Sequence, residues 1–356
     1  MMRFKSQIAA ALSILALSAC AQTGTAPLPI VPSSSQQIAA AAEGPAGWRP
    51  FSPDSPWNTK IPANASIDPG STEYIAGVAS DNALYINMNE WTVATYYIDA
   101  ATTPKYRFFP LFQTVQGAGI EPGARIPAPD FATPSGPPGG TEFLAMVDPK
   151  AGKAWELHQP QMNDEDGNWR ATFGSVVDLT GTGVSAPWMK AASPGDAAAA
   201  RPSGIPLVAG LIRLDELKAG RIDHALAFAY SAPRTDRFVA PASDGLYSGA
   251  YREATHFGLP MGARIQLDPD YDIENTLLSP AGKVIARALQ EYGAILVDEA
   301  GATTLFAEGS PAQIDAWKGV LAPGELQMLF TPEMMQENFR VLEIGEQMPG
   351  RPEAMR

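Results

Sequence analysis

The sequence predicts an all-β fold, an antiparallel β-sandwich or jelly roll with a few peripheral helices. Glycine and proline are both abundant, at 32 and 33 of 356 residues, as is typical of chains built from many short strands and ordered loops. Short segments rich in β-branched and aromatic residues follow one another with turn signals between them. Helical periodicity is rare. Together these observations favour sheets packed face to face.

The N-terminus has the pattern of an export signal. Arg3 and Lys5 precede an apolar run from Ile8 to Leu17, which is too short to span a bilayer permanently. Small residues then lead to Cys20, the only cysteine of the chain. We expect residues 1–19 to be removed and Cys20 to carry lipid, since several acyl chains on one residue anchor a protein firmly.

Beyond Cys20 we expect three regions. Residues 20–47 are rich in Ala, Ser, Thr, Pro and Gln, a composition that favours a flexible tether. Residues 48–345 are expected to form a single β-rich domain, and residues 346–356 a flexible tail. Ala21 after Cys20 favours the outer membrane in a cell with two membranes. We therefore expect a protein anchored at the cell envelope by its lipid alone.

Strands are expected in short segments that are rich in β-branched and aromatic residues and are separated from one another by turn residues. The expected strands are 83–87, 92–98, 106–109, 142–147, 154–158, 169–173, 175–179, 225–230, 263–267, 294–297 and 303–306. Residues 148–153 and 298–302 contain Asp and Gly between two such strands, and we expect both to be hairpin turns.

One helix is clearly expected. Ser279 supplies an N-cap, Pro280 a first-turn proline and Gly293 a C-terminal glycine around an amphipathic stretch. Shorter helical turns are expected at 214–218, closed by Gly220, and at 311–320 and 323–329.

Charge excludes some partners. The formal net charge is −13, and removing Arg3 and Lys5 with the signal makes it −15. The 25 basic residues form no cluster that would follow a phosphate backbone, so nucleic acid is not an expected partner. No Cys/His cluster is present for zinc, and no cofactor is expected.

The first candidate site lies on the strand at 154–158. Alternation places Trp155 and Leu157 on one face and Glu156 and His158 on the other. If the second face is concave, Glu156 and His158 share a cleft suited to proton transfer. If it is a solvated outer face, they have no special role.

The second candidate site lies at the start of the strand at 225–230. In a regular strand His224 points with Leu226, while Asp223 points the opposite way. A bulge can bring both to one site. Otherwise His224 is a core histidine and Asp223 caps a turn.

Two weaker patterns remain. Carboxylates alternate from Asp268 to Glu274, as in a calcium loop, but Ile273 and Ser279 stand where that loop has Gly and Glu. We keep calcium only as an alternative to a site without metal. Tryptophan rings stack on sugar faces, so four tryptophans are possible sugar platforms or else core residues: Trp57, Trp91, Trp155 and Trp188.

Four motifs resemble a widespread group of secreted bacterial proteins, many of them from actinomycetes. The motifs are Phe51–Asn58, Gly204–Arg213, Gly220–Leu226 and Ala286–Gly293, and the similarity covers nearly all of residues 48–310. The resemblance implies one exported, β-rich domain and no particular activity. It marks as motif positions Trp57, Asn58, Glu156, Arg213, Asp223 and His224.

The expected function is carbohydrate chemistry at the cell surface. A glycosidase needs two carboxyl groups that flank the scissile bond. We expect this pair to be Glu156 and Asp223, assisted by His224. The expected substrate contacts are Trp57, Asn58, His158 and Arg213.

Two alternatives stay open. A polysaccharide lyase would use His224 or a tyrosine as base, although the acidic charge disfavours a polyanionic substrate. A surface module that binds glycan without cleaving it would have the same fold and anchor. A serine hydrolase is not expected because no Gly-x-Ser-x-Gly elbow is present.

Overall fold

The structure is a computed structural model. It describes residues 44–88, 90–111, 119–136, 142–163, 165–190, 199–245, 257–309 and 314–351. The signal, Cys20 and most of the expected tether lie outside these residues, as does His256. None of the helices within the described ranges combines the length and apolarity needed to cross a membrane.

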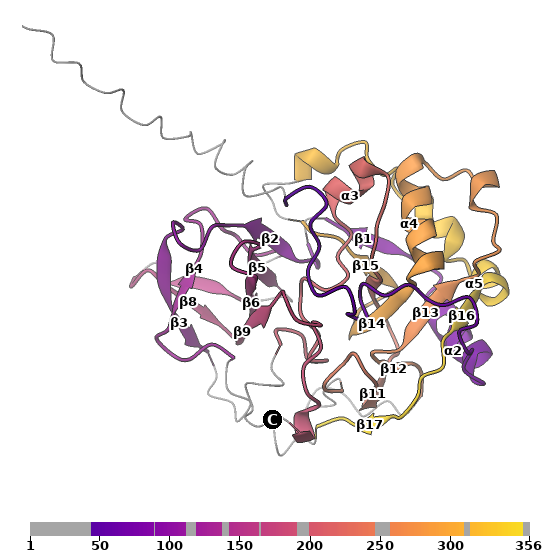
Figure 1. The fold of residues 1–356 in the computed structure, drawn as a ribbon, viewed down its shortest axis with the longest axis horizontal. Helices are drawn as coiled ribbons and strands as arrows, with labels where there is room; N and C mark the ends of the chain where they lie inside the picture. The colour runs from indigo at the N-terminus through magenta and orange to yellow at the C-terminus, as the bar shows by residue number, and fades with distance from the viewer. Residues whose placement is uncertain are drawn as a thin grey trace, which may run out of the picture.

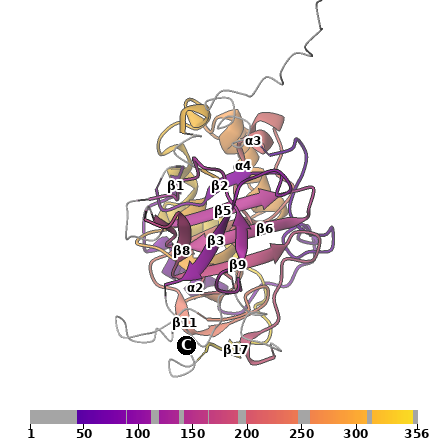
Figure 2. The ribbon, with the colours of Figure 1, turned by 90° about the vertical axis from the view of Figure 1, so that its left-hand side faces the viewer.

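Two four-stranded sheets form one half of the molecule, which lies on the left in Figure 1 and faces the viewer in Figure 2. The first has the order β2-β5-β6-β9, formed by Ala94–Tyr97, Phe143–Asp148, Lys153–His158 and Phe173–Asp178. The second has the order β4-β3-β8-β7, formed by Arg125–Pro127, Lys105–Pro110, Asn168–Ala171 and Gln161–Asn163. Each contains one parallel pair, β2 with β5 and β3 with β8. The expected hairpin at 148–153 joins β5 to β6.

Alternation along these strands builds a small core between the two sheets. Leu144, Met146 and Leu157 of the first sheet are buried together with Phe108 and Trp169 of the second. The opposite face of the first sheet is buried as well, because Phe143, Ala145 and Ala154 belong to the main core of the molecule. The centre of the sheet β2-β5-β6-β9 is therefore buried on both faces, and exposed residues are confined to Lys153 and to Val176 and Asp178 of β9.

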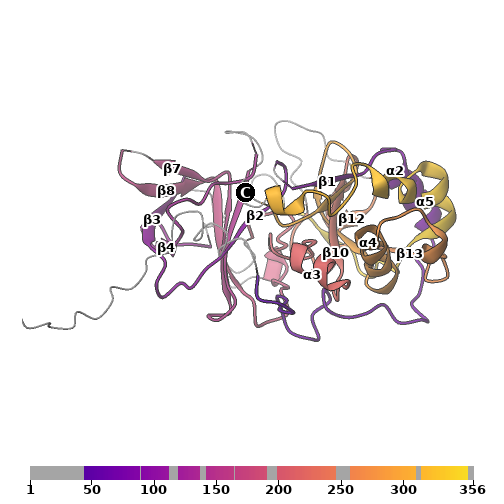
Figure 3. The same ribbon diagram turned by 90° about the horizontal axis from the view of Figure 1, so that it is seen from above.

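The other half is built on a six-stranded mixed sheet (Figure 3). Its order is β1-β15-β10-β14-β13-β16, formed by Tyr85–Asn87, Thr304–Phe306, Leu226–Tyr230, Ala294–Glu299, Arg264–Leu267 and Phe339–Val341. β1 runs parallel to β15 and β10 parallel to β14, while the other pairs are antiparallel. A small sheet, β12-β11-β17, is formed by Pro260–Met261, Arg234–Phe238 and Met348–Pro349.

Helices cover the six-stranded sheet. In α4 (Pro280–Glu291), Ser279 caps the first turn by accepting the Gly282 amide at 3.1 Å, as expected. α3 (Leu214–Ala219) ends at Gly220 with φ +76°. The 3-10 turns η4 (Ile314–Trp317) and η5 (Glu325–Leu329) match expected helical turns, whereas η1 (Trp188–Lys190) and η3 (Ile273–Asn275) were not expected. Also unexpected are α2 (Ser71–Ala79) and α5 (Pro332–Asn338), which pack on each other and on β16.

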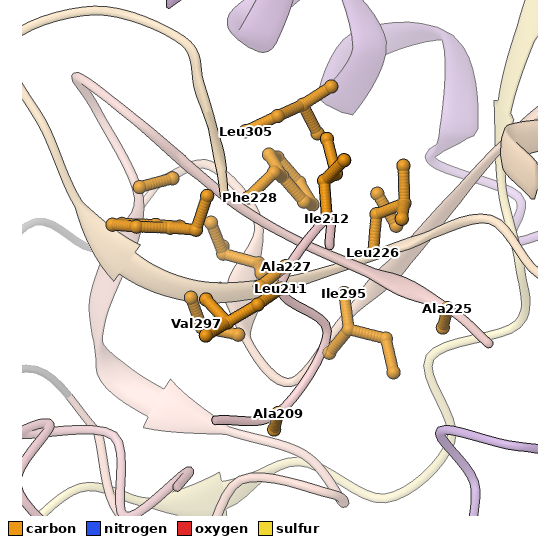
Figure 4. Close-up of a cluster of buried hydrophobic side chains, with 14 of the residues drawn as sticks. Ala209, Leu211, Ile212, Ala225, Leu226, Ala227, Phe228, Ile295, Val297 and Leu305 are labelled. Atoms are coloured by element: carbon orange, nitrogen blue, oxygen red, sulfur yellow. The ribbon is translucent and has the colours of Figure 1, made fainter. Parts of the chain in front are cut away.

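The main core centres on β10, whose five residues are all buried (Figure 4). Side chains of the segment 209–212, of β14 and of β15 pack around it. Gly210 allows the close approach, because a Cβ there would lie 2.6 Å from the Ala227 nitrogen and 2.7 Å from Trp57 Cζ3.

The fold expectation is confirmed in its coarser part. Strands predominate, each of the eleven expected strands is present in the described residues, and α-helices are few. The sheets are mixed rather than purely antiparallel, and the described strands form no closed sandwich or jelly roll.

Two local expectations are wrong. Residues 298–302 do not close a hairpin, because β10 lies between β14 and β15. The expected tail from residue 346 includes β17, where Met348 pairs with Phe238 and Pro349 with Arg237.

Candidate functional site

The structure does not bring Glu156 and Asp223 together. Glu156 is 0% exposed and faces the interior between the two halves, with its carboxyl oxygens accepting the Leu207 amide at 2.8 Å and the Val208 amide at 3.0 Å. Burial raises the pKa of Glu156 to about 7, although both amides act to lower it. No polymer can reach this carboxyl, so its expected catalytic role is wrong. Its contacts instead hold the segment around residue 207 against β6.

Trp57 and Asn58 are structural residues. Trp57 is 1% exposed in the main core, and its carbonyl accepts the Ala225 amide at 2.7 Å. The Asn58 amide group donates to the carbonyls of Pro50, Phe51 and Ser52 at 2.9–3.2 Å. Their expected role in substrate binding is contradicted by this burial.

His158 is partly buried at the end of β6, with its ring 5.3 Å from that of Phe143. Burial lowers the pKa of His158 to about 4, so its imidazole is neutral at physiological pH. Because Glu156 has no exposed surface and both of its carboxyl oxygens accept backbone amides, the expected cleft shared by Glu156 and His158 is not present.

Arg213 and Asp223 do meet at one place, a pocket of about 590 Å³ that we name the charged pocket. Its main lining residues are Trp48, Arg49, Arg213, Asp215, Glu216, Asp223 and Tyr292. Asp223 lies at the rim, 40% exposed and paired with Arg221, and the Tyr292 hydroxyl is 3.4 Å from its carboxylate.

His224 lies behind this pocket rather than in it. It is 4% exposed, with Nε2 3.1 Å from Glu216 Oε2 and Nδ1 2.9 Å from the Ala225 carbonyl oxygen. Since both of its nitrogens are occupied, His224 is not placed to act as a base on a polymer. It positions Glu216, which also accepts Arg213 Nη2 at 2.5 Å.

The carboxyl groups around Arg213 differ in pKa. Burial acts to raise the pKa of Glu216, but the effects of His224 and Arg213 are larger and hold this pKa at about 2. Burial raises the pKa of Asp215 against the effect of Arg213. Burial also raises that of Glu308 to about 7, and this carboxyl accepts the Tyr97 hydroxyl at 2.9 Å.

A second pocket, of about 800 Å³, carries the exposed aromatic rings, and we name it the aromatic pocket. Tyr85 of β1 is 54% exposed and Trp91, just before β2, is 53% exposed. The principal polar residues of the wall are Asn87, Asp298, Glu299 and Thr304. The pocket therefore combines flat apolar surfaces with hydrogen-bonding groups.

Asp298 is the titratable centre of the aromatic pocket. Burial raises its pKa to about 7, with Arg201 acting in the opposite direction. Arg201 is 1% exposed and lies 4.5 Å from the centre of the Phe306 ring and 5.9 Å from that of Phe143, both of which line the pocket. Burial lowers the pKa of Arg201 to about 10, and Asp298 and Glu156 counteract this.

Trp91 is held in an uncommon backbone conformation. Its φ is +50°, in the left-handed region that a bulky side chain rarely adopts. Such conformations cost about 1–3 kcal/mol and are concentrated at ligand-binding positions. Here the conformation accompanies an indole ring that lines a pocket and is more than half exposed.

The two pockets lie at opposite ends of the parallel strands β10 and β14. Asp223 and Tyr292 precede these strands, while Asp298 and Glu299 stand at the end of β14. The aromatic pocket is therefore at the carboxyl end of the pair, where open sheets with parallel strands usually bind ligands.

The carboxylates from Asp268 to Glu274 are used locally. Asp268 accepts the Asp270 amide, and Asp272 caps η3 by accepting the amides of Glu274 and Asn275. Glu274 pairs with Lys283 and Arg287. Within the part of the chain that the structure describes, no three His, Cys, Asp or Glu side chains are grouped to hold a metal ion.

Sequence reasoning identified Trp91 as a possible sugar platform but missed Tyr85, Asp298 and Arg201. The sequence pattern predicts only a strand at Tyr85 and only a turn at Asp298. A usable signal was present, since a carboxylate directly after a fully apolar strand marks the end of a buried strand. Arg201 gave no signal in the sequence.

Comparison with known proteins adds no identity: no protein-family model, no curated protein and no solved structure matches this chain.

Proposed function

We propose that this protein binds glycan at the cell envelope, with the aromatic pocket as the binding site. The observation that carries the proposal is the presence of two exposed rings, Tyr85 and Trp91, in one pocket with Asp298. The C–H face of a pyranose stacks on such rings, and its hydroxyls bond to carboxyl and amide groups. The export signal and Cys20 support a surface location.

The charge of the aromatic pocket favours a hydroxyl-rich ligand over an anion. Asp298 and Glu299 both line it, and the whole chain has a formal net charge of −13. A polyanionic glycan would meet these carboxyl groups, whereas neutral sugar hydroxyls can donate to them. We therefore place neutral glycans ahead of uronic-acid polymers.

The test is retention of the purified protein on insoluble neutral glycans, with Trp91→Ala and Tyr85→Ala as variants. Each change removes one stacking surface and is expected to weaken retention about tenfold. The matched control is Phe257→Ala, because Phe257 is an aromatic residue that is 83% exposed outside this pocket. Equal retention of all four proteins, or no retention of the unaltered protein, would refute the proposal.

Cleavage of the bound glycan is a second candidate, favoured by the raised pKa of Asp298. A carboxyl with a pKa of about 7 is still protonated near neutral pH and can act as the general acid of a glycosidase. In this proposal Asp298 gives its proton to the leaving glycosidic oxygen. Glu299 takes a proton from the water that adds to the anomeric carbon.

Asp298→Asn separates the two candidates. If the protein is a hydrolase, this variant is expected to retain glycan while release of reducing ends falls at least a hundredfold. If the unaltered protein releases no reducing ends from any glycan that it retains, the hydrolase candidate is wrong and binding alone remains.

A further inference from the structure

The charged pocket contains a polar pair that no other group satisfies. Arg213 Nε and Asp215 Oδ1 are buried atoms that lack a hydrogen-bond partner among the described residues. They lie 3.9 Å apart, beyond hydrogen-bond distance of each other. Both residues line the pocket, and Arg213 is 5% exposed.

The rest of the Arg213 side chain is fixed. Its Nη2 donates to Glu216 Oε1 at 2.5 Å, and its guanidinium lies 5.5 Å from the centre of the Trp48 ring. Glu216 in turn is held by His224. Arg213 Nε and Asp215 Oδ1 have almost no accessible surface, so a ligand reaches them only when the Asp215 side chain, which is 22% exposed, moves to admit it.

The chemistry of this pair selects the ligand. An N–H that needs an acceptor stands next to a carboxylate oxygen that needs a donor, and a hydroxyl group provides both at one oxygen atom. An anion would satisfy Arg213 but would meet the carboxylates of Asp215, Glu216 and Asp223. A simple cation would satisfy Asp215 but would meet Arg213 and Arg49.

We propose that the charged pocket binds a hydroxyl-rich neutral ligand, a sugar residue or a polyol, through one hydroxyl that accepts from Arg213 Nε and donates to Asp215 Oδ1. Further hydroxyls reach Asp223 and the phenol of Tyr292 at the rim, which are 3.4 Å apart. The indole of Trp48 forms part of the wall.

This site is separate from the aromatic pocket and does not depend on it. The two lie at opposite ends of β10 and β14 and share none of their lining residues. Each can be tested with the other disabled.

The experiment is saturation-transfer NMR on the chain that carries Trp91→Ala and Tyr85→Ala, so that the rings of the aromatic pocket do not contribute. The probes are D-glucose, D-galactose, N-acetylglucosamine and myo-inositol, with glycine and inorganic phosphate as the competing ligand classes. Phosphate has no C–H protons, so its binding is followed by broadening of its ³¹P signal. At least one of the hydroxyl-rich probes is expected to bind.

Asp215→Asn is then added to the same chain, which places an amide N–H or a neutral oxygen beside Arg213. Binding is expected to weaken about tenfold, as for loss of one hydrogen bond to a charged group. The matched control is Asp270→Asn, the same change at an exposed carboxylate outside both pockets, and it is expected to leave binding unchanged.

Three outcomes overturn the proposal: none of the four hydroxyl-rich probes binds, their binding is unaffected by Asp215→Asn, or only glycine or phosphate binds. If Asp215→Asn fails to fold, the proposal is tested on the chain without that change, through the NMR resonance of the Arg213 Nε–H. Addition of the bound probe to the chain without that change is expected to shift the Arg213 Nε–H resonance, and an unmoved resonance overturns the proposal equally.

Discussion

Replacing Glu156 by Gln tests the assignment of this carboxyl to the interior. Glu156 has a pKa of about 7 in the folded protein against an ordinary value of 4.5. Between these values the folded state holds a proton that the unfolded state has lost. Rising pH therefore favours unfolding, and this contribution to stability is lost as pH rises from about 4.5 to 7.

The magnitude follows from the two pKa values. Their difference corresponds to about 3 kcal/mol of unfolding free energy, since each pH unit between them contributes about 1.4 kcal/mol. The glutamine side chain of the variant cannot titrate. The unaltered protein is therefore expected to lose about 3 kcal/mol more than Glu156→Gln when pH rises from about 4.5 to above 7. The buried carboxyls of Glu308 and Asp298, also with pKa values near 7, remain in both proteins and cancel in this difference.

The assay is urea unfolding of both proteins at several pH values from 4.5 to 8. In Glu156→Gln the NH₂ group of the glutamine side chain points at one of the two buried backbone N–H groups. This contact between two donors costs about 1–3 kcal/mol of unfolding free energy at every pH. The stability difference between the two proteins should thus shrink with rising pH. A constant difference would show an ordinary pKa, and a growing difference would show that the two amides and Arg201 favour the ionised form. Glu337→Gln, at an exposed position of α5, is the control and should show no such trend.

Three further substitutions and one change of pH have definite expectations. Asn58→Ala removes three hydrogen bonds to carbonyls and should lower the unfolding free energy by about 1–3 kcal/mol without changing glycan retention; lost retention at unchanged stability would make Asn58 a ligand contact. Gly210→Ala forces a Cβ to 2.6 Å from a backbone nitrogen at a φ of +71°, and should cost more than about 3 kcal/mol by thermal unfolding. Gly220→Ala, with φ +76° and open space, should cost only about 1 kcal/mol, and similar losses at both glycines would contradict the packing argument. If Asp298 is a general acid, glycan cleavage should decline above about pH 7, the pKa of this carboxyl, and cleavage that continues to rise above pH 8 would exclude this role.

Local structure was predictable where one physical preference dominated. The helix α4 has a side-chain cap, a first-turn proline and a following glycine, and it begins and ends where these residues predict. The sequence does not predict α2, because this helix follows Gly70 without a side-chain cap and contains Gly77 in its last turn. β12 and β17 contain two residues each and include prolines, so they have no strand pattern to detect.

Strand pairing was not predictable from local pattern. The turn at 298–302 has the composition of a hairpin, yet the strands on either side of it both pair with β10. β10 is separated from them by more than sixty residues of sequence, and only its uniformly apolar character explains why it occupies the centre of the sheet.

The same limitation explains the wrong catalytic pair. Alternation correctly places Glu156 and Leu157 on opposite faces of the sheet. It cannot tell whether a face is solvated or covered by another part of the chain. On that face the segment at Leu207 and Val208 covers Glu156. Residues that stand out in the sequence can therefore serve packing rather than chemistry, as Trp57 and Asn58 do here.

The uniform burial of β10 also decides where chemistry is possible in this half of the molecule. No carboxyl, imidazole or amine lies within β10, where an unpaired charge would be costly to bury; the nearest such groups stand before this strand, as Asp223 and His224, or near the carboxyl end of the neighbouring parallel strand β14, as Asp298. From Tyr292 to Asp298 the chain runs along β14 for roughly 20 Å at about 3.3 Å per residue. A glycosidase needs its two carboxyl groups within about 10 Å of each other. A carboxyl from the charged pocket therefore cannot serve as partner to Asp298, and any hydrolytic pair must lie within a single pocket.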